Sequence, residues 1–211
     1  MQYKNEDYGN AIVQGIIQEY DIKSAGLSVM YAEKIISKDM YDYYSALPKE
    51  IRNIKLGIYI GEKGLSQKRN EALDKYMEKF INENEIKDGN IMEIASDALW
   101  LFNVRRLKVR EFGPVQIRLD RVASIMISWN SYRFYFDSWS GEFFIRGYTE
   151  ENQFTKKMKE LLAMVDSGID QQTIYNFLHD MKTDILYEVY QFISLEKSIQ
   201  LIDWLLEQII R

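Results

Sequence analysis

Residues 19–30 read Glu-Tyr-Asp-Ile-Lys-Ser-Ala-Gly-Leu-Ser-Val-Met, and this stretch decides the fold. The apolar residues over 11–22 predict a strand that ends inside it. The apolar residues that follow recur at helical spacing and predict a helix over 24–37, with Ser24 placed to cap its first turn. Asp21 lies where the strand ends. The sequence therefore predicts a carboxylate at the edge of a sheet, facing a cleft.

Composition limits the kinds of function. The chain has 211 residues, of which 46% are hydrophobic and 14% aromatic, which is enough for a sizeable core. It has no cysteine and a single histidine, His179, which excludes disulfides, cysteine-based zinc sites and histidine-rich metal sites. A metal site must therefore use carboxylate and backbone oxygens, which favours Mg or Mn. The net charge of −5 gives no overall attraction to nucleic acid, so such binding needs a local basic patch.

The location of the protein is predicted from what the sequence lacks. The N-terminus does not have the order of a signal peptide, and no apolar run approaches the roughly 20 residues that span a membrane. We therefore expect a cytoplasmic protein with no membrane partner. The 15 tyrosines and only 2 prolines fit the bias of an AT-rich genome, as in low-GC bacteria and their phages. The expected compartment is thus the cytoplasm of a bacterial host cell.

The spacing of apolar residues changes along the chain from helical to alternating and back. Helical periods continue at 38–46, from Pro48 to about Tyr59, and at 65–84. Alternating residues predict antiparallel strands at 91–96, 98–104, 106–111, 115–120, 122–128, 132–137 and 142–147. Helical spacing returns after Thr149. We expect an α+β fold in which helices cover an antiparallel sheet, with a core at 1–148 and a helical C-terminal region at 149–211 that packs on the core or on a partner.

A second acid with potential for chemistry is Asp97. It lies in Ile-Ala-Ser-Asp-Ala-Leu-Trp between two strand-like runs, where a tight turn fits. Acids on neighbouring strands can jointly hold divalent cations, and two-metal phosphoryl transfer uses ions about 3.5–4 Å apart. Asp21 and Asp97 are therefore candidate metal ligands. The simpler alternatives are that Asp21 caps the following helix and that Asp97 is an ordinary hairpin-turn residue.

The run from Asp21 to Met30 resembles the first palm motif of family-B DNA polymerases, Asp-x-x-Ser-Leu-Tyr-Pro-Ser-x-Met. The matching residues are Asp21, Ser24, Ser28 and Met30, whereas Gly26 and Leu27 stand where the family has Tyr-Pro. The run Lys49-x-x-x-Asn53-x-x-x-Gly57 resembles the second motif, a helix reading Lys-x-x-x-Asn followed by Tyr-Gly, with Leu at position 56 instead of Tyr. The third motif, Tyr-x-Asp-Thr-Asp-Ser, has a reduced counterpart at 94–98 that keeps Asp97.

These matches occur in the order of the family within about residues 15–130. The resemblance implies a reduced, palm-like core with Asp21 and Asp97 as catalytic metal ligands for Mg or Mn. It implies that Lys49 contacts the phosphates of an incoming nucleotide, a role that suits a basic point charge. The Tyr that is absent at Gly26 helps the family to exclude ribose. The alternative for Lys49 is the solvated face of a helix, shared with Glu50 and Arg52.

A basic cluster follows the third motif. Its candidate nucleic-acid-binding residues are Arg105, Arg106, Lys108, Arg110 and Arg118. The alternation of residues 106, 108 and 110 predicts one strand face, which Arg118 joins from the next strand of a hairpin turning at Gly113-Pro114. A basic face of this kind neutralises phosphates. The alternative is a solvated face paired with Glu111 and Asp120.

The leading hypothesis is a polymerase-palm-like, metal-dependent nucleotidyltransferase of phage or mobile-element origin that binds nucleic acid. The alternative is a non-enzymatic phage accessory or inhibitor protein that acts through protein–protein contacts. The last predicted helix has a broad apolar face that includes Trp204. This face packs on the sheet or forms an interface, so a protein partner or a homodimer through the C-terminal helices is compatible with both hypotheses.

Overall fold

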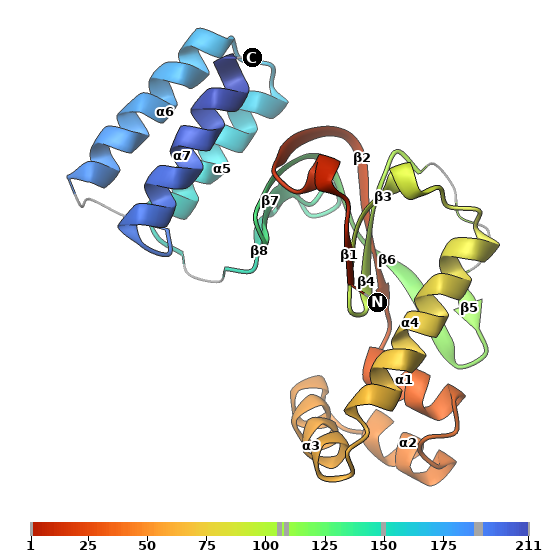
Figure 1. Cartoon of the computed structure of the whole chain (residues 1–211). Helices are drawn as coiled ribbons and strands as arrows, with labels where there is room; N and C mark the ends of the chain where they lie inside the picture. The colour runs from red at the N-terminus through yellow and green to blue at the C-terminus, as the bar shows by residue number, and fades with distance from the viewer. Residues whose placement is uncertain (1, 105–106, 108–109, 149–150, 188–191, 211) are drawn as a thin grey trace. The chain divides into compact units, whose positions relative to one another are not determined.

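The computed structural model describes residues 2–104, 107, 110–148, 151–187 and 192–210 (Figure 1). The fold is α+β, as predicted, and the strand pairs for which a register is defined are antiparallel. The chain forms two compact units. The first comprises residues 1–5 and 18–122, and the second comprises residues 6–17 and 123–211. The boundary predicted between residues 148 and 149 lies inside the second unit.

The first unit contains five strands or parts of strands side by side. Their order is β1 (Gln2–Lys4), β3 (Ile91–Ala95), β4 (Ala98–Phe102), the last part of β2 (Ala11–Ile22) and the first part of β6 (Val115–Trp129), and β5 (Glu111–Phe112) also pairs with β6. The helices of this unit are α1 (Ala25–Ala32), α2 (Lys38–Ser45), α3 (Lys49–Glu62), α4 (Ser66–Glu83) and the short 3₁₀ helix η2 (Asp88–Asn90).

Helix α4 covers the sheet of the first unit with its apolar face. Leu73, Met77 and Phe80 of α4 are buried in one cluster with sheet residues that include Tyr20 and Leu99. The rings of Tyr20 and Phe80 lie 5.4 Å apart. A second cluster joins α1, α2 and α3. The two clusters fix the end of β2 and the start of α1 on one rigid support.

The second unit contains the first part of β2, the last part of β6, β7 (Tyr132–Phe136) and β8 (Phe143–Arg146), together with η1 (Glu6–Tyr8). Its helices are α5 (Gln153–Asp166), α6 (Gln171–Leu186) and α7 (Leu195–Ile210), which lie side by side in Figure 1. Their apolar faces pack on the strands around Phe134, Phe154 and Phe192. Helix α7 therefore packs inside this unit. None of the helices in the described part of the chain is long and apolar enough to cross a membrane.

Most element predictions are confirmed, and the exceptions have local causes. The strand at 11–22 is β2 with the same bounds. The helix expected over 24–37 ends at Ala32, because Lys34 adopts a left-handed φ of 57° that turns the chain. The strands expected at 115–120 and 122–128 are one continuous strand, β6. Half of the strand expected at 106–111 lies outside the described residues, and no local pattern predicts β1.

Substitution of Phe80 by Ala should lower the free energy of unfolding by about 3–5 kcal/mol, because it leaves a cavity beneath β2. The side chain is completely buried. The measurement is a urea titration followed by circular dichroism.

The control is Ile54→Ala on α3, where the side chain is 66% exposed and the expected change stays within about 0.5 kcal/mol. Equal losses for the two variants would contradict the packing of α4 on the sheet.

Candidate functional site

A pocket of about 540 Å³ lies in the first unit where β2 ends and α1 begins. We call it the strand-end pocket. It collects charged side chains from five segments that are distant in sequence. These are Asp21 at the end of β2 with Lys23 just after it, Lys49 and Arg52 of α3, Arg69 of α4, Asp97 of the β3–β4 turn and Arg118 of β6. Residues 24–27 form part of the wall.

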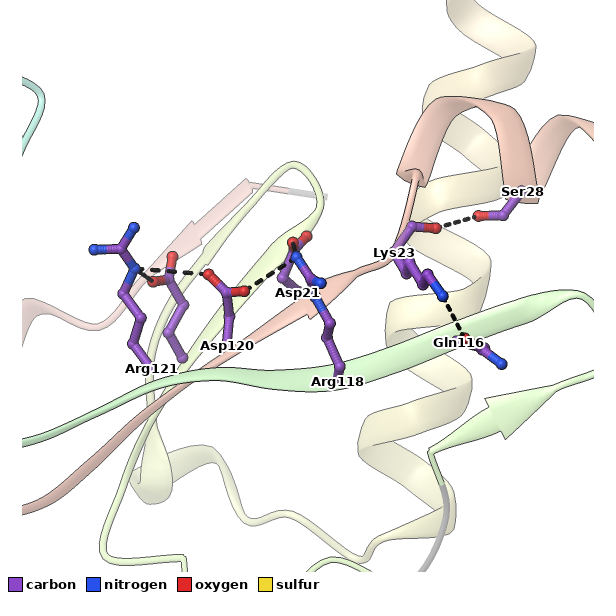
Figure 2. Close-up of polar contacts among 8 residues, drawn as sticks. Asp21, Lys23, Ser28, Gln116, Arg118, Asp120 and Arg121 are labelled. Atoms are coloured by element: carbon purple, nitrogen blue, oxygen red, sulfur yellow. Dashed lines mark hydrogen bonds and ion pairs between the residues drawn. The ribbon is translucent and has the colours of Figure 1, made fainter. Parts of the chain in front are cut away.

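The connection from β2 to α1 is held by backbone contacts. The carbonyl of Ser24 accepts hydrogen bonds from the N–H groups of Leu27 and Ser28, both at 2.9 Å. The Oγ of Ser28 donates to the carbonyl of Lys23 at 3.0 Å (Figure 2). Ser24 stands at the N-cap with a left-handed φ of 52°, and its side chain makes no capping hydrogen bond. The strand thus turns sharply into the helix, and Asp21 lies directly before this turn.

Asp97 reaches the same pocket from a tight hairpin. Ala95 pairs with Ala98, so Ser96 and Asp97 form the turn, and Ser96 has a left-handed φ of 57°. The carbonyl of Asp97 accepts a hydrogen bond of 3.1 Å from the N–H of Ile22. This bond fixes the hairpin tip beside the end of β2. The structure therefore brings together Asp21 and Asp97, which are separated by 75 other residues in the sequence.

The electrostatics of Asp21 follow from this geometry. The pKa of its carboxyl group is raised from 3.8 to about 6, first by burial and next by the nearby charge of Asp97. The charge of Arg118 and its hydrogen bond lower the pKa, while the charge of Asp120 raises it. Carboxylates that repel one another in a half-buried site attract a multivalent cation.

Acidic and basic side chains alternate across β2 and β6. Arg118 Nη2 lies 3.4 Å from Asp21 Oδ2 and 3.1 Å from Asp120 Oδ1 (Figure 2). Arg121 Nε lies 3.6 Å from both Asp120 Oδ2 and Glu19 Oε2. We call these five residues the charge row. One end of the charge row lies in the strand-end pocket, because Asp21 and Arg118 line it.

Three of the cations in the pocket were not candidates from the sequence. Arg52 lies one turn after Lys49 on α3, so helical spacing from Lys49 indicates it. Lys23 lies two residues after Asp21. Arg69 begins α4, and its Cδ lies 3.5 Å from the position that a Cβ on Gly26 would occupy. No local pattern predicts Arg69, because only the packing of α4 brings it to the pocket.

Of the predicted basic face, the structure describes Arg110 and Arg118. Arg105, Arg106 and Lys108 lie outside the described residues. The hairpin turns at 113–114 with Phe112 opposite Val115, and the N–H of Ile117 donates to the carbonyl of Arg110. Arg110 therefore lies opposite residue 117, on the other face from Arg118, because side chains alternate along a strand. Arg110 hydrogen-bonds buried Tyr20, whose pKa is raised by burial and lowered in part by this arginine. The alternative pairing of Arg118 with Asp120 is the one that the structure contains.

The pocket offers a divalent cation two carboxylates. Within the described residues, no group of three or more His, Cys, Asp or Glu side chains has the geometry of a metal site. The hard oxygen donors of Asp21 and Asp97 fit Mg or Mn, which are commonly held by one or two carboxylates plus substrate phosphates and water. The residues present therefore suit an ion that arrives with a phosphate ligand.

Comparison with known proteins places the chain among phage proteins. The family model of the Bacteriophage PBS1 gene 130 protein matches residues 1–204. The chain belongs to this family. A search of curated proteins gives no match. The family description names a phage gene and states no activity, so the chemistry of the strand-end pocket carries the functional argument.

The raised pKa of Asp21 makes the stability of the fold depend on pH. The folded-state value of about 6 lies above the ordinary 3.8, so the folded protein binds this proton more tightly than the unfolded chain. The contribution is fully present below pH 3.8 and is lost as the pH rises through about 6. Relative to Asp21→Asn, the wild type should lose on the order of 2 kcal/mol of unfolding free energy between about pH 4 and 7. Urea titrations of both proteins across this range measure the difference.

Carbon-13 detected titration of the Asp21 carboxyl group provides the control. Asp97→Asn should lower its midpoint and Arg118→Met should raise it, since these changes remove a repelling and an attracting charge. A midpoint that changes with neither substitution would contradict the proximity of Asp21, Asp97 and Arg118.

Proposed function

We propose that this phage protein is a metal-dependent nucleotidyltransferase that binds a nucleoside triphosphate in the strand-end pocket. The observation that supports the proposal is the meeting of Asp21 and Asp97 in a pocket whose other charged side chains are cationic. Two acids beside a group of cations suit a ligand that is itself anionic and carries a divalent ion. A nucleoside triphosphate with Mg or Mn meets both requirements.

Asp21 and Asp97 would hold the ion through their carboxylate oxygens. Such an ion, when bound, stabilises the negative charge of phosphate oxygens and orients the attacking and leaving groups. Asp97 is oriented by its hairpin turn and by the hydrogen bond from Ile22, so its position does not depend on a flexible loop. Preorganised carboxylates of this kind reduce the cost of assembling the site.

The cationic side chains of the pocket would bind the phosphates of the nucleotide. Lys23, Lys49, Arg52, Arg69 and Arg118 line the pocket together with the two acids, which leaves a net charge of +3 if all seven groups are ionised. A polyphosphate needs such a surplus. Arginine binds phosphate oxygens through two parallel N–H groups, and lysine acts as a point charge. Lys49 keeps the role that the polymerase resemblance implies, and Arg52 and Arg69 extend the site beyond the motif.

The reaction would be the attack of a nucleic-acid 3′-hydroxyl oxygen on the α-phosphorus of the bound nucleotide. A P–O bond forms to the attacking oxygen, the P–O bond to the pyrophosphate group breaks, and the hydroxyl proton passes to water. The cations of the pocket stabilise the charge that develops on the departing pyrophosphate. The acceptor strand would be held by Arg105, Arg106 and Lys108, the predicted basic residues that lie outside the described part of the chain, in the cytoplasm of an infected bacterial cell.

Removal of either acid should weaken binding of the divalent ion. We expect wild-type protein with a triphosphate to bind Mn²⁺, and Asp21→Asn or Asp97→Asn to weaken this binding at least about tenfold, because these are the two carboxylates among the described residues that line the pocket. Counting free Mn²⁺ by electron paramagnetic resonance measures the affinity, and extension of a fluorescent primer measures transfer.

Glu78→Gln is the matched control, since it removes the same charge from an exposed position on α4 outside the pocket. Its Mn²⁺ affinity should equal that of the wild type. If both aspartate variants bind Mn²⁺ like this control, the metal site is wrong.

Reversal of two cations on α3 should weaken triphosphate binding. Lys49→Glu combined with Arg52→Glu places two like charges against the phosphates, and we expect a loss of at least about 100-fold in affinity. Fluorescence anisotropy with a labelled triphosphate at two salt concentrations measures it. Lys63→Glu, at the end of the same helix and outside the pocket lining, should change the affinity less than about twofold. Equal effects of the two changes would show that only the general charge of the protein matters.

The second candidate is the non-enzymatic accessory or inhibitor protein. One observation favours it. The outward face of α3 exposes three isoleucines, namely Ile51, Ile54 and Ile58, with exposures of 46%, 66% and 56%. Exposed apolar stripes often belong to protein–protein contacts. In this candidate function the strand-end pocket has no role. The variant with Lys49→Glu and Arg52→Glu would therefore leave binding of the protein partner unchanged.

A further inference from the structure

The charge row places a side-chain cation where a divalent cation would bind. Arg118 Nη2 contacts Asp21 Oδ2 at 3.4 Å, and Asp21 is one of the two acids of the strand-end pocket. The same nitrogen contacts Asp120 Oδ1 at 3.1 Å (Figure 2). One guanidinium group is thus shared between an acid that lines the pocket and an acid further along β6.

The two contacts of Arg118 differ in strength. The contact with Asp120 is the shorter, and Asp120 is also held by Arg121 at 3.6 Å. The contact with Asp21 is at the long end of hydrogen bonding, and the Arg118 side chain is 51% exposed. A long ion pair whose arginine is half exposed is weak and is readily exchanged for other partners. Arg118 can therefore leave Asp21 while it stays on Asp120.

We propose that Arg118 is a built-in competitor of the divalent cation, which holds Asp21 in the free protein and is displaced from it toward the phosphates when the ion and its nucleotide bind. The proposal rests on the proposed function, because it assigns the regulation of that same site. A +2 ion at Asp21 repels the guanidinium group, and a triphosphate in the pocket attracts it. Ion and nucleotide then bind cooperatively, since each removes the competitor that opposes the other.

This arrangement has a consequence for the order of events. When the ion binds alone, Arg118 loses its contact with Asp21 and gains no new anionic partner. When the ion binds with a triphosphate, the phosphates become the new partner of the guanidinium group. The free protein thus binds the ion weakly, and the site is loaded fully only with nucleotide. Arg118 is in this sense a positioning residue for Asp21 and a binding residue for phosphate.

The test compares Arg118→Met with wild type at pH 8, where the Asp21 carboxyl group is ionised. Mn²⁺ alone should bind the variant roughly 3- to 10-fold more tightly, because the competing charge is gone. A labelled triphosphate in the presence of Mn²⁺ should bind it about 5- to 10-fold more weakly. Arg118→Lys should restore both wild-type values in large part. Circular dichroism and the melting temperature verify that each variant is folded.

Arg121→Met is the matched control. Arg121 lies in the same charge row and contacts Asp120 and Glu19, but it does not line the pocket. Its Mn²⁺ affinity should differ from wild type by less than about twofold. A change as large as that of Arg118→Met would assign the effect to general charge and overturn the proposal.

The outcomes separate this inference from the proposed function. Equal or weaker Mn²⁺ binding by Arg118→Met, with a wild-type site that does bind Mn²⁺, overturns the competition and leaves the nucleotidyltransferase proposal in place. Absence of Mn²⁺ binding in wild type and variant, with and without triphosphate, overturns both. Tighter Mn²⁺ binding together with weaker triphosphate binding supports the displacement.

Discussion

Two backbone hydrogen bonds at the end of β2 hold the functional region together. The N–H of Ile22 donates to the carbonyl of Asp97 at 3.1 Å, and the N–H of Lys23 donates to the carbonyl of Gln116 at 2.9 Å. The first attaches the β3–β4 hairpin to the strand end, and the second attaches β6. Asp21 precedes both donors, so its side chain lies between the hairpin acid and the basic residues of β6. Without these two hydrogen bonds, the hairpin and β6 would not be held beside the strand end, and their charged side chains would not meet in the pocket.

The charges around the strand end are arranged at a moderate electrostatic cost. Burial and the neighbouring acids Asp97 and Asp120 raise the pKa of Asp21, so ionisation of this carboxyl group costs free energy in the folded protein. Arg118 relieves part of this cost. A structural protein would more commonly place such acids on the surface, because unpaired and half-buried charges reduce stability. The retention of this cluster beside a pocket is what makes a site for a charged ligand the physically reasonable interpretation.

Most of the elements, and the positions of Asp21 at a strand end and of Asp97 in a turn, could be predicted from the sequence, whereas their surroundings could not. Strand β2 and the turn at Asp97 have local signals, and a hairpin brings its own tip to a definite place. Helix α1 was predicted too long because its residues 27–30 are all buried, so it has no polar face whose end marks the end of the helix. The charge row depends on the register of β2 against β6, and Arg69 depends on the packing of α4. Neither is encoded in a short pattern, since both arise from contacts between distant segments.

The strands β2 and β6 each begin in one unit and end in the other, so both units are discontinuous in sequence. The strand-end pocket is lined by residues between Asp21 and Arg118, whereas β1 of the same unit is separated from them by a segment of the second unit. A recombination crossover at the unit boundary within β2 or within β6 would therefore divide a strand and would not exchange a complete unit. The family match extends from residue 1 to residue 204 and therefore includes both shared strands.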